Sequence, residues 1–268
     1  RGRVRQLNGR VPAAKPWVKL CVSPFGIWRP GYAEQVKGFD AYEQLYADSR
    51  LWWANNWVDY FTPQLYWPIA KAEQSYPALM RWWGEQNATD RHLWIGLYTS
   101  RVRAATTEGN GLAPSNAWTA AEILAQVDTA RAYPRVSGTV HFSMKAFLKD
   151  QGGVATQLKE QAYGALALVP PSPWLSTRAP AAPVVQVKRN ATTRGLSVTM
   201  SMPKPQVARW FLLQSRTDGV WGSRLVAPHA GAEEISLNGD GLLPDRLVVT
   251  ALDRAGVASP PVRLIVAP

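Results

Sequence analysis

The chain has 268 residues, of which 46% are hydrophobic and 18% are charged, and its formal net charge is +11. This apolar content excludes a wholly disordered chain, and the composition lacks the repeats of a coiled coil or a collagen-like fibre. The longest apolar stretch, residues 162–171, is much shorter than the roughly 20 residues that a transmembrane helix needs, so we expect no transmembrane segment.

Cysteine and histidine are scarce. Cys21 is the single cysteine, which excludes an internal disulfide framework and a cysteine-rich zinc site. His92, His141 and His229 are scattered without the spacing of metal ligands. We therefore expect no metal and no cofactor.

The excess of Lys and Arg has two interpretations. It is typical of nucleic-acid binders, whose basic stripes follow phosphates, and of proteins that work near anionic envelope polymers or lipids. The basic residues are spread along the chain, without the pattern of a helix–turn–helix, a zinc finger or an RNA-recognition domain. The sequence thus disfavours nucleic acid as a partner. A binder of anionic polymers, driven by charge alone, stays open as an alternative.

The composition changes near residue 170. Proline-rich segments at 170–173 and 179–183 are typical of an extended, semi-rigid linker. Most of the 13 Trp precede residue 175, so the two halves have different cores. We predict a first domain over 1–168, a linker over 169–183 and a second domain over 184–268.

In the first half, short apolar runs alternate with helical patterns. The predicted order is a strand over 17–23, a helix over 41–53, a strand over 57–66, a helix over 76–85, a strand over 92–98, a helix over 117–132, a strand over 138–143 and a helix over 154–168. Ser115 or Asn116 is the expected N-cap of the third helix. This alternation predicts an α/β fold with a parallel sheet, and four such units make half of an eight-unit TIM β/α barrel.

The second half has a different pattern, with short runs rich in Val, Leu and aromatic residues between turn residues. The predicted strands cover 184–188, 196–201, 209–214, 223–226, 234–237, 246–252 and 262–267. The turn signals between them include Asp218-Gly219 and Asn238-Gly239-Asp240-Gly241. Strands at this spacing predict a small antiparallel β-sandwich.

In a β/α barrel the active site lies where strands end and loops begin. The predicted strand ends are rich in aromatic, amide, hydroxyl and basic side chains, a chemistry that suits sugars. Trp and Tyr rings stack on the C–H faces of sugars, while Gln, Arg, Ser and Lys bond to hydroxyl and acyl groups. The predicted substrate-binding residues are Trp28, Arg29, Gln64, Tyr66, Trp67, Tyr98, Ser143 and Lys145.

Carboxylates are scarce at these strand ends, although glycoside hydrolysis usually needs two of them. Asp59 begins a predicted strand, on the side away from the expected site. Glu34, in the loop after the first strand, is the candidate catalytic residue. Glu108, in the long loop over 99–116, is a weaker candidate.

Several of these residues have a structural alternative. Trp28 and Arg29 also fit a stacked pair at the base of a loop. His141 fits a hydrogen-bonded core histidine better than a catalytic one. Lys145 fits either a contact with an anionic group or a solvated side chain, and Cys21 fits an inert buried thiol.

Four blocks of the first half form long motifs. They are Lys15-Pro16-Trp17-Val18-Lys19-Leu20, Ser23-Pro24-Phe25-Gly26-Ile27-Trp28-Arg29-Pro30-Gly31, Asp59-Tyr60-Phe61-Thr62-Pro63-Gln64-Leu65-Tyr66-Trp67 and Gly138-Thr139-Val140-His141-Phe142-Ser143. Together they resemble the C-terminal half of the glycosyl hydrolase-like 10 domain, over residues 1–168. Residues 247–256 more weakly resemble the last hairpin of fibronectin type III-like domains.

The resemblance implies a TIM-barrel O-glycosyl hydrolase that acts on bacterial cell-wall polysaccharide, with peptidoglycan glycan strands as its substrate. It implies a place in the bacterial cell envelope, periplasmic or secreted, with a lipid anchor in the full-length protein as one option. Envelope protein partners would then bind through the C-terminal domain. A non-catalytic carbohydrate-binding or envelope scaffold protein is the alternative.

The acidic half of the family's barrel has no counterpart in this sequence. The family carries an Asp-Asp-Tyr-Phe motif at a strand end, whereas Asp59-Tyr60-Phe61 matches another block of the family. The chain also begins Arg1-Gly2-Arg3-Val4, without a Met or a signal-peptide pattern. We therefore expect a fragment that supplies sugar-binding subsites and is itself inactive.

Overall fold

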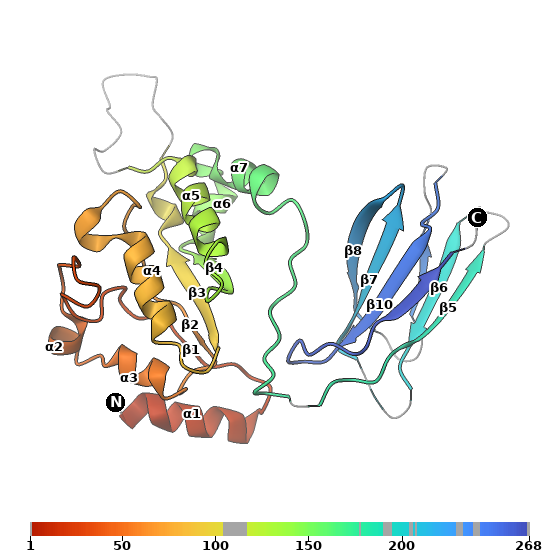
Figure 1. Ribbon diagram of the computed structural model, residues 1–268, viewed down its shortest axis with the longest axis horizontal. Helices are drawn as coiled ribbons and strands as arrows, with labels where there is room; N and C mark the ends of the chain where they lie inside the picture. Colours follow the sequence, from red (N-terminus) through yellow and green to blue (C-terminus); the bar gives the residue numbers. More distant parts are fainter. Residues whose placement is uncertain are drawn as a thin grey trace. The chain divides into compact units, whose positions relative to one another are not determined.

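The computed structural model describes residues 2–266, apart from 104–116, 177, 190–194, 204–205, 207, 229–232 and 238–241. The chain divides into two compact units, Arg1–Ala165 and Leu166–Pro268 (Figure 1). Within the described part, no helix is both long and apolar enough to cross a membrane.

A four-stranded parallel sheet forms the centre of the first unit. Its strands are β1 (Cys21–Val22), β2 (Tyr60–Phe61), β3 (His92–Leu97) and β4 (Gly138–His141), and they lie side by side in chain order. Every neighbouring pair is parallel, with Cys21 opposite Tyr60 and Trp94 opposite Gly138. The predicted parallel sheet with helices is therefore confirmed.

Helices and short 3-10 turns connect and cover these strands. The α-helices are α1 (Gly2–Ala14), α2 (Ala41–Leu45), α3 (Ser49–Ala54), α4 (Tyr76–Glu85), α5 (Ala120–Arg131), α6 (Met144–Leu148) and α7 (Val154–Gln161). The 3-10 turns are η1 (Ala72–Gln74), η2 (Thr99–Arg101) and η3 (Gln151–Gly153). Figure 1 shows α4 and α5 beside the sheet, where both contact β3.

Three aromatic side chains hold the helices to the sheet. The ring of Phe61 on β2 lies 5.0 Å from Trp53 and 5.0 Å from Trp83, between ring centroids. Both indoles are buried, and their N–H groups still donate, Trp53 Nε1 to the carbonyl of Trp83 and Trp83 Nε1 to that of Gly26. Truncation of a buried aromatic ring of this kind costs roughly 3–5 kcal/mol.

The predicted helix over 41–53 is wrong in one respect, because the structure splits it into α2 and α3. Tyr46 ends α2 in the left-handed conformation, with a φ of 51°. Asp48 then begins α3 as its N-cap, and its carboxylate accepts from the backbone N–H of Leu51 at 3.4 Å. A side chain that caps a new helix competes with continuation of the old one, and this local bond overrides the helical spacing of the apolar residues.

Other boundaries also differ from the prediction. The strands predicted over 17–23 and 57–66 pair over only two residues each, and the helix predicted over 154–168 ends at Gln161. The third predicted helix begins at Ala120 after an N-cap at Thr119, while Ser115 and Asn116 lie outside the described residues.

The second unit consists of two antiparallel sheets, as predicted. Its strands are β5 (Val184–Arg189), β6 (Leu196–Ser201), β7 (Trp210–Thr217), β8 (Val220–Val226), β9 (Glu233–Leu237), β10 (Arg246–Leu252) and β11 (Val262–Ile265). The orders are β11-β10-β7-β8 and β5-β6-β9. One buried cluster draws side chains from both sheets, among them Val198 and Phe211.

Turn chemistry explains two connections in this unit. Asp218 and Gly219 join β7 to β8 with φ values of 49° and 76°, the positive values that a two-residue hairpin turn requires. After β10, the carboxylate of Asp253 accepts from the backbone N–H groups of Ala255 and Val257 at 2.8 Å each. The first turn lies where the sequence predicts it, and the predicted turn over 238–241 lies outside the described residues.

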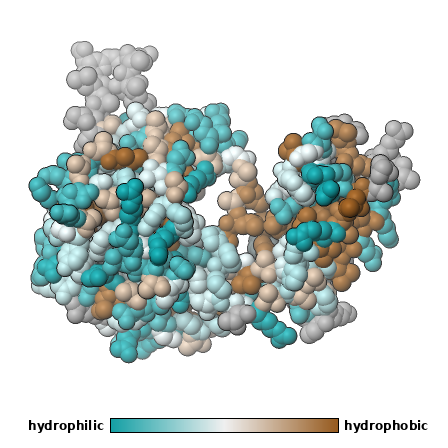
Figure 2. Space-filling model, viewed as in Figure 1, coloured by the Kyte–Doolittle hydropathy of each residue, from teal (hydrophilic) through white to brown (hydrophobic). Residues whose placement is uncertain are grey.

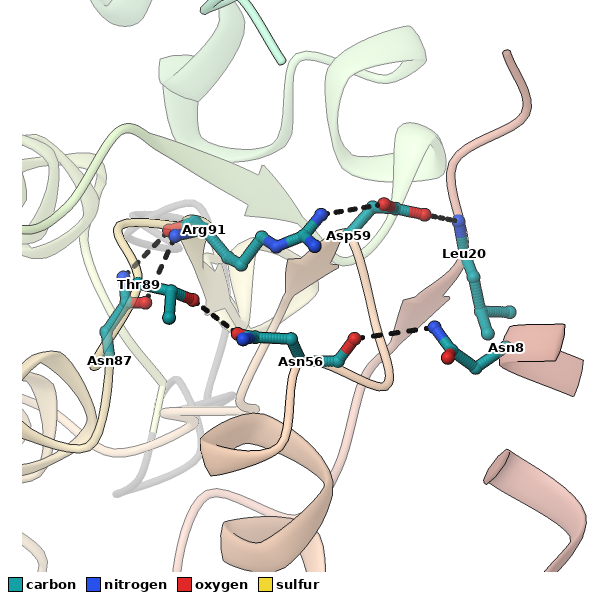
Figure 3. Close-up of polar contacts among 7 residues, drawn as sticks. All are labelled: Asn8, Leu20, Asn56, Asp59, Asn87, Thr89 and Arg91. Atoms are coloured by element: carbon teal, nitrogen blue, oxygen red, sulfur yellow. Dashed lines mark hydrogen bonds and ion pairs between the residues drawn. The ribbon is translucent and has the colours of Figure 1, made fainter. Parts of the chain in front are cut away.

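A polar network joins the amino-terminal ends of the parallel strands (Figure 3). The carboxylate of Asp59 accepts from the backbone N–H of Leu20 at 2.7 Å and forms an ion pair with Arg91 at 3.1 Å. Asn56 accepts from the side chains of Asn8 and Thr89, which come from α1 and from the loop before β3. These bonds tie β1, β2 and β3 together at the edge opposite the expected site.

Loss of the Asp59 carboxylate should destabilise the first unit. The side chains of Asp59 and Arg91 are only 10% and 17% exposed, so Asp59→Ala leaves a nearly buried guanidinium without this partner. We expect a loss of about 3 kcal/mol in the free energy of unfolding, measured by urea denaturation.

The matched control is Glu73→Ala. Its ion pair with Lys37 is exposed, and its loss should cost under about 1 kcal/mol. Equal losses in the two variants would contradict the structural role of Asp59.

Candidate functional site

The carboxyl ends of the parallel strands meet at one edge of the sheet. Beyond β2 the chain continues to Gln64, which forms isolated bridges to Phe25 and to Gly96 and so joins the ends of β1, β2 and β3. The backbone at Gly26 packs closely against the backbone of Gln64, because a Cβ atom at residue 26 would lie 2.3 Å from the carbonyl oxygen of Gln64. Only glycine fits this position without a shift of the backbone.

A cavity of about 640 Å³ opens at this edge. It lies among the segment after β2, the residues after β3 and the start of α5. Its lining consists of Tyr66, Trp67, Pro68, Lys71, Arg101, Ala117, Trp118, Thr119 and Glu122. A cavity of this size accommodates one or two sugar rings, since ligand sites typically span roughly 300–1,000 Å³.

Aromatic rings from four segments pack into one cluster beside the cavity. The ring of Tyr98, after β3, lies 4.9 Å from Tyr66, 5.9 Å from Phe142 and 6.4 Å from Trp118. Tyr66 also stacks on Phe142, at 6.0 Å. Burial, with a further contribution from Tyr98, raises the pKa of Tyr66, so its hydroxyl stays protonated at neutral pH and can donate a hydrogen bond.

Glu122 is the one carboxylate among the described residues that line the cavity. Its Oε1 accepts from the backbone N–H of Ile69 at 2.8 Å and from Nε2 of Gln126 at 2.7 Å. The buried Gln126 also donates to the carbonyl of Trp67 at 3.2 Å. Glu122 thus fixes the segment that carries Trp67 against α5.

Two cations share the lining with these groups. Lys71 reaches Glu73 at 3.9 Å and is half exposed. The guanidinium of Arg101 lies 5.8 Å from the ring centroid of Tyr98. The cavity therefore combines aromatic surface, two positive charges and one carboxylate, which suits a ligand with C–H faces and anionic or carbonyl oxygens.

A hydrogen-bonded chain of side chains packs behind the end of β4. Thr99 Oγ1 and His141 Nδ1 are 2.7 Å apart, and His141 Nε2 lies 2.8 Å from the hydroxyl of Tyr163. Burial lowers the pKa of His141 to about 4, so the imidazole is neutral at pH 7 and is bonded on both nitrogens. His141 is therefore a satisfied structural histidine, as the sequence favoured.

Of the predicted site residues, only Tyr66 and Trp67 line the cavity, and Tyr98 supports them. Gln64 donates from Nε2 to the carbonyl of Ser23 at 3.1 Å. The hydroxyl of Ser143 lies 3.2 Å from that of Ser100, just before α6.

Trp28 and Arg29 lie elsewhere, in a packed loop. Trp28 is 8% exposed and stacks on Trp82, at 6.0 Å between centroids. Arg29 forms ion pairs with Asp40 and Glu43, both at 3.2 Å. Both residues thus make structural contacts, but not as a stacked pair, because the guanidinium over the Trp28 ring is that of Arg50 and Arg29 lies over the ring of Tyr42. These contacts leave little of Trp28 for a ligand.

Glu34 and Lys145 are exposed. Glu34 lies in the loop after β1 outside the cavity lining, and no described residue forms an ion pair with it. Lys145 is exposed on α6. Glu108 lies outside the described residues.

Within the part that the structure describes, no cluster of three or more His, Cys, Asp or Glu could hold a metal ion.

The sequence analysis selected none of Lys71, Arg101, Trp118 and Glu122. Arg101 stands three residues after Tyr98, within the segment considered at the end of the third strand, where only Tyr98 was selected. Trp118 and Glu122 come from the start of α5, and the strand-end rule does not consider helix starts. Their place at the cavity follows from a parallel bridge between Val102 and Trp118.

Comparison with known proteins identifies a family model and several relatives to which this chain is similar. Residues 2–111 match the family model Glycosyl hydrolase-like 10. The chain is 36% identical over 187 residues to the glycosyl hydrolase YngK of Bacillus subtilis (strain 168), an alignment that covers 67% of this chain and 35% of that protein. It is 29% identical over 171 residues to the glycosyl hydrolase DigH of Escherichia coli (strain K12), covering 60% of this chain and 37% of DigH.

These alignments show homology to proteins named glycosyl hydrolases, and the chain spans about a third of the length of these relatives. A solved structure, the spore cortex lytic enzyme SleM of Clostridium perfringens, matches with 10% identity and a TM-score of 0.27, covering 78% of this chain and 79% of that one. At this level of similarity, the match to SleM supports no argument about function.

Two substitutions of Glu122 should distinguish how its negative charge and its hydrogen bonds each contribute to the free energy of unfolding. In Glu122→Gln an amide oxygen can still accept from Ile69 and Gln126, whereas Glu122→Ala leaves these donors unpaired. We expect Glu122→Ala to lower the free energy of unfolding by about 1–3 kcal/mol, and Glu122→Gln to lower it by much less. Urea denaturation checks this, and equal losses would contradict the bonding role.

Acidification should weaken the first unit through His141. Its folded-state pKa of about 4 lies below the ordinary 6.5, so the unfolded chain binds the proton first as the pH falls. This contribution to stability is complete above the ordinary pKa and is lost as the pH falls toward about 4, with ~2 kcal/mol lost by about pH 5.

The control is His141→Asn, which is less stable at every pH but should show a correspondingly shallower decline with acid. Unfolding free energies measured across this pH range check the difference. Parallel declines in the two proteins would contradict the assignment.

Proposed function

We propose that this chain is part of a glycoside hydrolase that acts on bacterial cell-wall polysaccharide, and that its first unit supplies sugar-binding subsites. Its parallel sheet is then half of a TIM β/α barrel, and the cavity lies at the carboxyl edge, where such barrels bind substrate. The aromatic cavity, in a chain homologous to proteins named glycosyl hydrolases, is the observation that carries this proposal.

The lining offers complementary contacts to a cell-wall glycan. Tyr66 and Trp67 present ring faces or edges on which the apolar C–H face of a sugar packs, while Trp118, which is 8% exposed, packs behind them in the lining. Lys71 and Arg101 provide donors for carboxylate and acetyl oxygens, which occur along peptidoglycan glycan strands. A substrate of this kind places the protein in the bacterial cell envelope, periplasmic or secreted.

Hydrolysis needs a second carboxyl group besides Glu122. Glu122 already accepts two hydrogen bonds through one oxygen, so we assign it a positioning role at the subsite. The proton-transfer carboxyl groups then belong to sequence that the longer relatives have and this chain lacks. The chain alone is expected to bind glycan without cleaving it.

A non-catalytic carbohydrate-binding protein is the second candidate function. The observation in its favour is the lining itself, which among the described residues has aromatic rings and cations but a single, doubly bonded carboxylate. Turnover of glycan strands by the longer protein separates the two functions, because a binding protein shows affinity without products.

Removal of the rings should weaken glycan binding by the full 268-residue chain. We expect Tyr66→Ala and Trp67→Ala each to reduce affinity for peptide-free glycan strands about tenfold, since each loses a stacking face. Isothermal titration calorimetry measures the effect.

The matched control is Tyr46→Ala, which removes a tyrosine ring that is 83% exposed and lies outside the cavity lining. Its affinity should equal that of the unsubstituted chain. Equal affinity of all three variants, with intact folding, would contradict the proposed subsite.

A further inference from the structure

The second unit carries an unusual row of side chains on the outer face of its four-stranded sheet. Cross-strand register places Ile265, Arg246, Arg216 and Trp221 side by side on β11, β10, β7 and β8. The next row brings Arg263 beside Val248. Side chains directly opposite each other in antiparallel strands have Cβ atoms roughly 5 Å apart, so these groups form one surface.

Alternation along the strands confirms that this surface faces away from the core. Leu247 and Leu213, on the opposite face of β10 and β7, are buried in the core cluster. Arg246 and Arg263 are exposed, and Trp221 is 48% exposed on the edge strand β8. Figure 2 shows both hydrophobic and hydrophilic areas on the visible face of the second unit.

The positive charges of this row are only partly neutralised. Arg216 donates from Nε to Asp245 at 3.0 Å and forms an ion pair with the same carboxylate through Nη2. Among the described residues, neither Arg246 nor Arg263 forms an ion pair with a carboxylate. Arg216 and Arg246 both hold the pKa of the Asp245 carboxyl below its usual range, so this carboxylate already offsets repulsion between the paired arginines. The exposed guanidinium of Arg263 adds a further positive charge to the surface.

We propose that this row, together with Arg263, is a docking surface for an anionic polysaccharide. The guanidinium groups bind carboxylates on successive sugars, while Trp221 and Ile265 contact the C–H faces of the rings. Charge complementarity selects an anionic partner, and the choice of a polysaccharide over another polyanion rests on the proposed function of the first unit. The surface then binds the protein to the polysaccharide independently of the cavity in the first unit.

The test uses the full chain and polygalacturonate, a polysaccharide with one carboxylate on each sugar. We expect Arg246→Ser/Arg263→Ser to weaken binding roughly tenfold or more at low ionic strength, through loss of charge-assisted hydrogen bonds. Trp221→Ala should also weaken binding, and methyl-esterified polygalacturonate should bind less tightly than the free acid. Calorimetry gives the affinities, and circular dichroism confirms the fold of each variant.

The matched control is Arg224→Ser/Lys188→Ser. It removes the same two charges from exposed positions, Arg224 on the opposite face of β8 and Lys188 on the other sheet. Its affinity should stay within about twofold of the unsubstituted chain. Equal weakening of both double variants would show attraction by net charge alone and would overturn the proposal.

Other results would also overturn the proposed polysaccharide-binding surface. Absence of binding, or polyglutamate bound as tightly as polygalacturonate with no effect of Trp221→Ala, would overturn the recognition of sugar. Single-stranded DNA bound more tightly through the same arginines would assign the surface to nucleic acid instead. The affinity lost in Arg246→Ser/Arg263→Ser reports on the surface, whereas the affinity for peptide-free glycan strands lost in Tyr66→Ala reports on the cavity, so failure of the surface and failure of the cavity are distinguishable.

Discussion

The parallel register of β1 to β4 is the constraint on which the candidate site depends. Hydrogen bonding between neighbouring parallel strands brings all four carboxyl ends to one edge of the sheet. Tyr66, Tyr98 and Phe142 follow three of these strands, and this register, with the bridge of Gln64 to Gly96, brings their rings within 4.9–6.0 Å of one another. The bridge from Val102 to Trp118 then adds the start of α5 and closes the cavity.

The two edges of this sheet have different chemistry. At the amino-terminal edge, Asp59, Arg91 and Asn56 use their polar groups on one another and on backbone atoms, which is typical of a structural role. At the carboxyl edge, Lys71 and Arg101 line open space beside aromatic rings. The polar groups at the amino-terminal edge stabilise the fold, whereas those at the carboxyl edge also line a cavity that a ligand can enter.

The sequence predicted the architecture well, because hydrophobic periodicity and turn residues are local signals. Every strand in the described part of the chain overlaps a predicted one, although β1 and β2 pair over only two residues each, and the helices α1 and α6 were not predicted. The break between α2 and α3 depends on one capping bond at Asp48, which periodicity does not record. The site was predicted in part: the strand-end rule found Tyr66 and Trp67 but also selected Trp28, which packs on Trp82. Trp118 and Glu122 reach the cavity through tertiary packing, and no local pattern predicts that.

The indole N–H resonances of the full chain, followed during titration with peptide-free glycan strands, test the saccharide site most directly. If the cavity binds glycan, the signals of Trp67 and Trp118 shift together and saturate with one dissociation constant. The buried indoles of Trp53 and Trp83 serve as internal controls and should not move. Saturating shifts that leave Trp67 and Trp118 unchanged, or no shifts at all, would contradict the account.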